Sequence, residues 1–121
     1  MAKILLVEDD PSIIQLYSFK LSSAGYEVRT AQNGLIGLKT LPDFFPDLIL
    51  LDLRMPVMDG EAFLQAFRKK PEHADVPVIV LTNISRDEAP KTLWHYGISG
   101  YYVKANHTPA ELVTIIGEVL A

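Results

Sequence analysis

The chain has 121 residues, of which 49% are apolar, enough for one domain with a single hydrophobic core. It has no cysteine, which excludes a disulfide framework and a thiolate metal site and fits a reducing compartment. Its net charge of −4 argues against direct nucleic-acid binding. Because no apolar stretch approaches membrane-spanning length and no signal pattern opens the chain, we expect a cytoplasmic protein without membrane contact.

Strands and helices are predicted to alternate along the chain. Apolar runs bounded by turn signals predict strands at Lys3–Val7, Glu27–Ala31, Leu48–Leu51, Val76–Leu81 and Tyr101–Val103. Helical patterns lie between them at Ser12–Ser23, Gly34–Leu41, Gly60–Lys69, Asp87–Tyr96 and Pro109–Leu120. Pro90 suits the fourth helix only within its first turn, so that helix is predicted to begin near Asp87. With no linker or repeat between these elements, residues 1–121 are predicted to form one domain.

Five strand–helix units predict the α/β class, with a doubly wound (βα)5 fold. The sheet is expected to be parallel, with right-handed crossovers and helices on both faces. The flavodoxin-like strand order 2-1-3-4-5 places the first and third strands at the topological switch point, where ligands bind in such sheets. Residues at the carboxyl ends of these two strands are therefore the first candidates for a functional site.

Acidic residues follow both of these strands. Glu8, Asp9 and Asp10 come after the first strand, and Asp52 comes directly after the third. Asp10 is assigned to capping the next helix, because Pro11 suits the first helical position. The other carboxylates would repel one another, and a hard divalent cation with oxygen ligands resolves that conflict. The pattern predicts a Mg²⁺ site at this edge of the sheet.

The fourth and fifth strands also end in polar side chains, Thr82 and Lys104. Taken singly, a threonine at a strand end is a common turn residue and a lysine is a common surface charge. Together with the acids they supply a nucleophile, a cation site, a hydroxyl and an ammonium group, which are the parts that phosphoryl transfer requires. We therefore expect Asp52 to act as the nucleophile.

These residues, in this order, resemble the receiver domains of two-component response regulators, and the chain is similar in length to the single-domain chemotaxis type. The resemblance runs from about Lys3 to Leu120. The matching features are Glu8-Asp9, Asp52 with Met55-Pro56-Val57-Met58-Asp59-Gly60 behind it, Thr82, and Gly100-Tyr101 before Lys104. The ordered set is far more specific than any single motif within it.

The resemblance implies a phosphorelay function in which Asp52 accepts a phosphoryl group from a histidine kinase or a histidine phosphotransfer protein. It implies a Mg²⁺ ion held by Glu8, Asp9, Asp52 and the backbone carbonyl of Arg54. It implies that Thr82 and Lys104 contact the phosphoryl oxygens. It also implies that Tyr101 is an aromatic switch that turns inward when Thr82 moves. The face formed by the fourth helix, fifth strand and fifth helix would carry the output. Such a domain is a signalling phosphoacceptor that catalyses only its own phosphorylation and dephosphorylation.

Departures from the family pattern lie beside the predicted site. Ala105 stands where most receivers have a proline preceded by a cis peptide bond. A cis bond to any other residue costs about 2.5–4 kcal/mol. The Lys104-Ala105 bond is therefore predicted to be trans, with a shifted loop ahead of the last helix. Asn83 replaces a small residue and either obstructs a donor or donates a hydrogen bond to the phosphoryl group. Arg54 and Ile84 are positions that modulate access of water, and they favour a slowly hydrolysing phosphoprotein.

Other classes of function fit less well. An aspartyl phosphatase would need a second acid at the position of Arg54, and a nucleotide or flavin domain would need a glycine-rich loop where the acids stand. The competing hypothesis is a receiver-fold scaffold or binding module that signals without phosphorylation, because function resides in the site and not in the fold. The histidines lack ligand spacing and are expected at the surface or in loops: His73, His95 and His107. The effector, a missing output domain such as a DNA-binding one, and the oligomeric state are left open.

Overall fold

A computed structural model describes residues 1–121. Five parallel strands form one sheet in the order β2-β1-β3-β4-β5, as predicted. The strands are β1 (Lys3–Val7), β2 (Glu27–Ala31), β3 (Leu48–Leu51), β4 (Val78–Thr82) and β5 (Gly100–Val103). The helices are α1 (Pro11–Ser23), α2 (Gly34–Thr40), α3 (Gly60–Arg68) and α4 (Pro109–Leu120), with 3-10 helices η1 (Pro71–His73), η2 (Arg86–Glu88), η3 (Lys91–Tyr96) and η4 (Lys104–Asn106).

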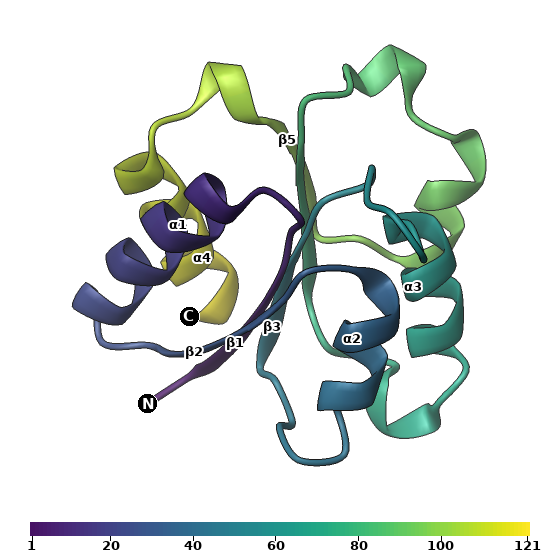
Figure 1. Ribbon diagram of the computed structural model, residues 1–121, viewed down its shortest axis with the longest axis horizontal. Helices are drawn as coiled ribbons and strands as arrows, with labels where there is room; N and C mark the ends of the chain where they lie inside the picture. Colours follow the sequence, from purple (N-terminus) through teal and green to yellow (C-terminus); the bar gives the residue numbers. More distant parts are fainter.

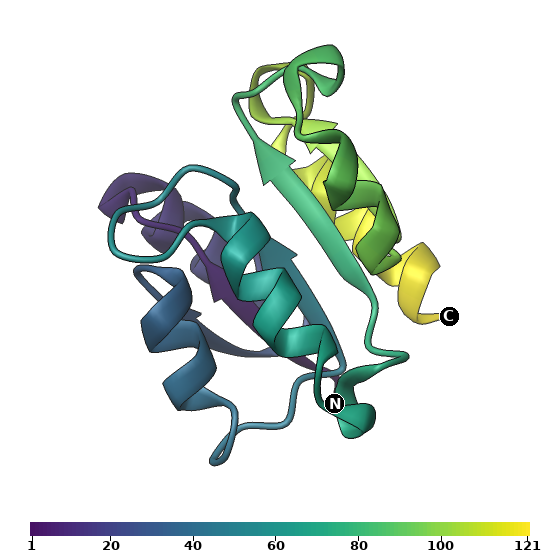
Figure 2. The same ribbon diagram turned by 90° about the vertical axis from the view of Figure 1, so that its right-hand side faces the viewer.

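Two helical layers cover the sheet. Helices α1 and α4 pack side by side on one face, while α2, α3 and the segment with η3 lie on the other (Figures 1 and 2). The central strands β1, β3 and β4 are almost entirely apolar because both of their faces are covered. Each face has its own core: Phe63, Leu64 and Phe67 of α3 lie in the larger one, and Leu21 of α1 and Ile116 of α4 lie in the other.

The helix termini explain why the crossovers begin where they do. The side chain of Asp10 accepts hydrogen bonds from the backbone N–H groups of Ser12 (2.9 Å) and Ile13 (3.4 Å), so the predicted capping role of Asp10 is confirmed. Asp59 caps α3 in the same way, and Thr108 forms a capping box with Glu111 at the start of α4. These caps fix each helix start close to the strand end that precedes it.

The fourth crossover differs from the sequence prediction of an α-helix over Asp87–Tyr96. Two short 3-10 helices, η2 and η3, stand in its place, separated by Ala89 and Pro90. The physical reason is Pro90, whose ring disfavours helical backbone angles at the residue before it, and Ala89 is indeed extended (φ −66°, ψ 147°). An α-helix therefore cannot run through this point, although the fold class is as predicted.

Two smaller expectations can be compared with the structure. The chain contains no cis peptide bond, so the trans prediction for Lys104-Ala105 is confirmed, and η4 forms the loop ahead of α4. The expectation that His73 is a surface or loop residue is wrong. His73 is 3% exposed, and its ring stacks on that of Phe67, with centroids 4.4 Å apart, and lies against that of Phe45, with centroids 5.1 Å apart. No helix in the structure is both long and apolar enough to cross a membrane.

Candidate functional site at the carboxyl edge of the sheet

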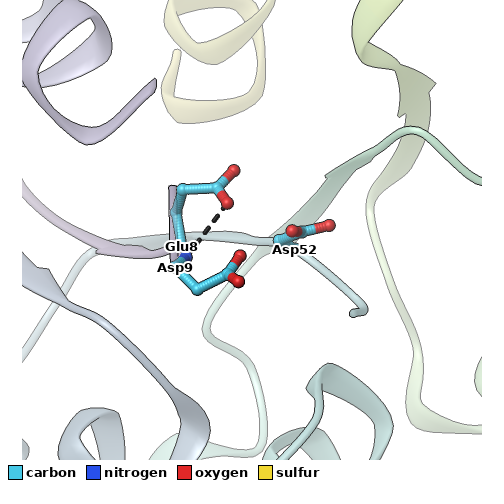
Figure 3. A group of neighbouring side chains, drawn as sticks. All are labelled: Glu8, Asp9 and Asp52. Atoms are coloured by element: carbon cyan, nitrogen blue, oxygen red, sulfur yellow. Dashed lines mark hydrogen bonds between the residues drawn. The ribbon is translucent and has the colours of Figure 1, made fainter. Parts of the chain in front are cut away.

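The parallel register brings the acidic strand ends together. Val7, the last residue of β1, is paired with Leu51, the last residue of β3, so Glu8 and Asp52 emerge beside each other. Glu8, Asp9 and Asp52 each offer a carboxylate oxygen, and these three oxygens lie within 4.8 Å of one another (Figure 3). The sequence prediction of a three-carboxylate cluster at this edge is therefore confirmed as geometry.

A cleft of about 410 Å³ opens above the cluster. It is strongly polar, because only one of its lining residues, Ile84, is hydrophobic. The lining residues are Glu8, Asp9, Asp10, Asp52, Arg54, Thr82, Asn83, Ile84, Glu88 and Lys104. Every site residue predicted from the sequence except Tyr101 thus lines one cleft, and Glu88 is a lining residue that the sequence pattern did not predict. Pro90 is the feature of the sequence that could have indicated this position. It lies two residues after Glu88 and interrupts the helix, so Glu88 lies on a separate 3-10 turn at the cleft.

Asp52 lies at the floor of the cleft and is 6% exposed. Its Oδ1 accepts a hydrogen bond from the backbone N–H of Leu53 (2.8 Å), while its Oδ2 is 3.5 Å from the Lys104 ammonium. Gly60 presses on the backbone just behind it: a Cβ atom on Gly60 would lie 2.3 Å from the Asp52 carbonyl oxygen. Asp52 is therefore held in place, with one carboxylate oxygen left only loosely engaged.

Lys104 pairs with Glu8 more closely than with Asp52. Its Nζ forms a short ion pair with Glu8 Oε1, and the other oxygen of Glu8 accepts the backbone N–H groups of Asp9 (3.0 Å) and Asp10 (3.2 Å). Burial raises the pKa of Glu8 to about 7. The hydrogen bond from Lys104 lowers this pKa, and the negative charge of Asp52 raises it. Burial alone would lower the pKa of Lys104, but its hydrogen bond with Glu8 and the charge of Asp52 hold that pKa above its ordinary value. The ammonium group is thus kept charged and aimed into the cleft.

Thr82 and Tyr101 are connected through the chain that follows β4. Thr82 is 1% exposed, and its hydroxyl oxygen accepts a hydrogen bond from the backbone N–H of Ile84 (3.4 Å). The Tyr101 hydroxyl donates to the carbonyl oxygen of the same residue, Ile84, at 2.7 Å. Tyr101 is 6% exposed, and its ring lies against that of Trp94, with centroids 5.6 Å apart. The ring predicted to turn inward is therefore already directed inward in this structure.

The residue types fit a hard divalent cation. Asp9 and Asp52 provide carboxylate oxygens, and no cysteine or histidine lines the cleft to favour a softer metal. Glu8 adds negative charge close by, although its own oxygens are engaged by Lys104 and by two backbone N–H groups. Carboxylates and water are the ligands that Mg²⁺ prefers, so this donor set suits it.

Comparison with known proteins agrees with this geometry. A family model described as "Response regulator receiver domain" matches residues 4–117. The chain belongs to the response regulator receiver domain family. It is a signalling domain of the two-component type, as the sequence resemblance implied.

Individual relatives extend this result. The chain is 36% identical over 104 residues to the DNA-binding dual master transcriptional regulator RpaA of Synechocystis. The aligned residues make up 86% of this chain and 43% of RpaA. It therefore spans less than half the length of that relative. The chemotaxis protein CheY4 of Vibrio cholerae has a TM-score of 0.90 and 35% identity over 98% of both chains. The phosphorylated cyanobacterial phytochrome response regulator RcpA has a TM-score of 0.80 and 28% identity, covering 98% of this receiver domain and 90% of RcpA.

Proposed function

We propose that residues 1–121 act as one phosphoacceptor domain in which Asp52 takes a phosphoryl group from a phosphohistidine of a sensor kinase or a phosphotransfer protein. The observation that carries the proposal is the position of Asp52, buried on the floor of an acidic cleft beside Thr82 and 3.5 Å from Lys104. A relative of the same fold is described in its phosphorylated form, which supports the assignment.

The transfer is an in-line displacement at phosphorus. A carboxylate oxygen of Asp52 attacks the phosphorus atom, the phosphorus–nitrogen bond of the donor breaks, and its electron pair leaves with the imidazole. Lys104 and Thr82 line the same cleft as Asp52, and Lys104 is kept charged by Glu8, so in this proposal both contact the phosphoryl oxygens. These two residues stabilise the charge on the transferred group.

Asp9, Asp52, Glu8 and the backbone carbonyl of Arg54 are proposed to hold Mg²⁺. The bound cation would offset the charge of the carboxylates and of the phosphoryl oxygens. Beyond its own phosphorylation and dephosphorylation the domain catalyses nothing in this proposal. It acts in the cytoplasm, without direct contact to nucleic acid or membrane, and passes its signal to an effector protein or to an output domain.

The output would arise from the link between Thr82 and Tyr101. A phosphoryl group on Asp52 draws the Thr82 hydroxyl towards it, which disturbs the contact between Thr82 and Ile84. Tyr101 holds the carbonyl of Ile84, so the segment with η2 and η3 responds together with β5. The surface formed by η3, β5 and α4 changes as a population shift between two packings.

Intact mass after incubation with Mg²⁺ and a phosphodonor tests the acceptor. Wild type should gain one phosphoryl group, Asp52→Asn should gain none, and Asp43→Asn, an exposed aspartate outside the cleft, should behave as wild type. Both small donors and a phosphohistidine protein are needed, because Asn83 lines the cleft and either obstructs a small donor or binds its phosphoryl group. No gain from either donor class would favour the alternative, a receiver-fold scaffold that signals without phosphorylation.

The lifetime of the phosphoryl group is proposed to depend on two other cleft residues. Arg54 is exposed at the rim, where its guanidinium can pair with phosphoryl oxygens, and Ile84 is the single apolar lining residue. Replacing both by alanine should speed dephosphorylation, because water gains access to the aspartyl phosphate. A slower double variant would contradict this part of the proposal.

A further inference from the structure

Glu88 is placed at the mouth of the cleft by the unusual fourth crossover. It ends η2, directly before the extended pair Ala89 and Pro90. Its Oε1 accepts a hydrogen bond from the hydroxyl of Ser85 (2.8 Å), which orients the carboxylate. Glu88 lines both the main cleft with Asp52 and an adjoining hollow with Arg54, so it faces the route by which a donor approaches.

Glu88 is the one carboxylate of the cleft whose charge is not compensated by an ion pair, a helix N-terminus or the proposed cation. Glu8 is paired with Lys104, Asp10 caps α1, and Asp9 and Asp52 belong to the proposed cation site. Glu88 forms no ion pair. The cleft contains five carboxylates and two basic side chains, so a bound divalent cation would leave one negative charge uncompensated. Because Asp10 lies at the N-terminus of α1, Glu88 is the carboxylate that contributes this negative charge on the side of the η2 turn.

We propose that Glu88 determines donor specificity: its carboxylate disfavours dianionic acyl phosphates and so favours phosphorus–nitrogen donors in which a proton on nitrogen offsets one negative charge. In phosphoramidate that proton is on the nitrogen bonded to phosphorus, and in phosphohistidine it is on the other ring nitrogen. This inference rests on the proposed phosphoacceptor function of Asp52. Like charges at a cleft mouth lower the local concentration of an anion, and the effect grows with the charge of that anion.

Two small donors separate the charge effect from the chemistry. Acetyl phosphate is a dianion near neutral pH, and transfer from it breaks a phosphorus–oxygen bond, with the electron pair leaving on acetate. Phosphoramidate carries one negative charge fewer because its nitrogen is protonated, and transfer breaks the phosphorus–nitrogen bond, with the electron pair leaving on ammonia. In both reactions the new bond is from Asp52 to phosphorus. Any difference in their response to Glu88 therefore reports the charge of the donor.

The measurement is the rate of phosphorylation per unit donor concentration, by intact mass at saturating Mg²⁺, for wild type, Glu88→Gln and Glu88→Lys. One charge at a distance on the order of 10 Å in water changes a rate by about twofold per unit of donor charge. Glu88→Gln should therefore raise the acetyl phosphate rate about fourfold and the phosphoramidate rate about twofold. The ratio of the two rates should rise about twofold in Glu88→Gln and about fourfold in Glu88→Lys.

Ionic strength gives a second readout. In wild type, added salt should speed the reaction with acetyl phosphate more than the reaction with phosphoramidate, because screening weakens the repulsion. This difference should shrink in Glu88→Gln. Glu72→Gln is the matched control: Glu72 is an exposed glutamate in η1, at the opposite edge of the sheet, and its loss should leave the ratio unchanged.

The outcomes distinguish this inference from the function on which it rests. Phosphorylation of Asp52 with an unchanged ratio in both Glu88 variants would overturn the donor preference and leave the phosphoacceptor intact. Equal acceleration with both donors would also overturn it, because that result indicates relief of a steric obstruction and not of a charge. No phosphorylation of any variant by either small donor would overturn the donor preference, and no phosphorylation by a phosphohistidine protein as well would overturn the phosphoacceptor proposal itself.

Discussion

The crossovers that follow β3 and β4 start at neighbouring strand ends, yet they are held in different ways. The first contains α3, a regular helix with three large apolar side chains in the core, capped by Asp59. The second has only the short turns η2 and η3, and Leu93 is its one fully buried side chain. Hydrogen bonds of the α-helical type are missing from it, so it depends on contacts from elsewhere.

Those contacts come mainly from three side chains, one of which is Glu61 of α3, whose carboxylate accepts a hydrogen bond from the hydroxyl of Thr92 in η3. Arg68, the last residue of α3, donates hydrogen bonds to the carbonyl oxygens of Tyr96 (2.8 Å) and Gly97 (3.3 Å) at the end of η3. The Tyr101 hydroxyl holds the start of the same crossover through Ile84. The segment beside Thr82 is therefore held by separate side-chain contacts and by one buried leucine, Leu93, and not by a continuous helix. Such a segment has few cooperative contacts and can open more easily than α3, which suits it to transmit a signal.

The largest expected effect comes from removing the fastening at the end of the crossover. Arg68 also donates to the carbonyls of His73 (2.7 Å) and Val76 (2.8 Å), so Arg68→Ala leaves several carbonyl groups unpaired. We expect the free energy of unfolding to fall by about 3 kcal/mol in urea titrations. Lys69→Ala, next to it and exposed, should change stability by less than about 0.5 kcal/mol. Similar values for the two variants would show that Arg68 does not hold the crossover.

Loosening the other end should have a smaller effect. Tyr101→Phe keeps the ring against Trp94 but removes the hydrogen bond to Ile84, at an expected cost of about 1 kcal/mol. Amide hydrogen exchange should speed up over residues 84–89 and remain unchanged in α3. Uniform acceleration in both crossovers would contradict the idea that they open independently.

The first crossover contains local strain that can be relieved. Val57 lies in a tight turn at φ 70°, where Met58 N–H donates to the Pro56 carbonyl (2.7 Å). Such backbone angles cost a residue with a Cβ atom about 1–2 kcal/mol, partly offset by the greater chain entropy of glycine. Val57→Gly should therefore raise the free energy of unfolding by about 0.5–1 kcal/mol. Val57→Ala, which retains a Cβ atom, should give no gain; equal gains would rule out strain as the cause.

The smallest effect concerns acid stability of the first crossover. Burial lowers the pKa of His73 below its ordinary 6.5, so the folded protein binds fewer protons there than the unfolded chain. The neutral His73 ring therefore contributes to the free energy of unfolding above about pH 6.5, and this contribution is lost as the pH falls through the lowered pKa of the folded state. Between about pH 7.5 and 5.5, the free energy of unfolding should fall less in His73→Phe than in wild type. The two decreases should differ by about 1 kcal/mol or less. His95→Gln, an exposed control, should follow wild type, and parallel curves for all three would contradict a buried neutral His73.

Much of the site was predictable from the sequence because it depends on strand ends. Apolar runs locate β1, β3 and β4, and a parallel sheet then brings Glu8 and Asp52 together at one edge. The pairing of Lys104 with Glu8 was not predictable, since it depends on side-chain distances at the end of β5. The position of Glu88 was not predictable, because it follows from the break at Pro90, whereas the sequence pattern predicts one helix through that point.

Other features depend on tertiary contacts that no local pattern records. His73 sits in a short polar stretch typical of the surface, and only its stacking on Phe67 buries it. Val57 has no local preference for a left-handed backbone, and its conformation is imposed by the turn that connects β3 to α3. Arg68 looks like an ordinary helix-end charge until Tyr96 and Gly97 are brought to it by the fold.

Trp94 is the one tryptophan of the chain. Its ring lies against Tyr101 on one side, and the guanidinium of Arg86 lies over it at 5.1 Å. It is 38% exposed, so its fluorescence is sensitive to both the protein and the solvent. Any movement of Tyr101 or of η2 must alter the surroundings of this single indole. The domain therefore has a built-in optical reporter, and its switching can be followed in real time without a label.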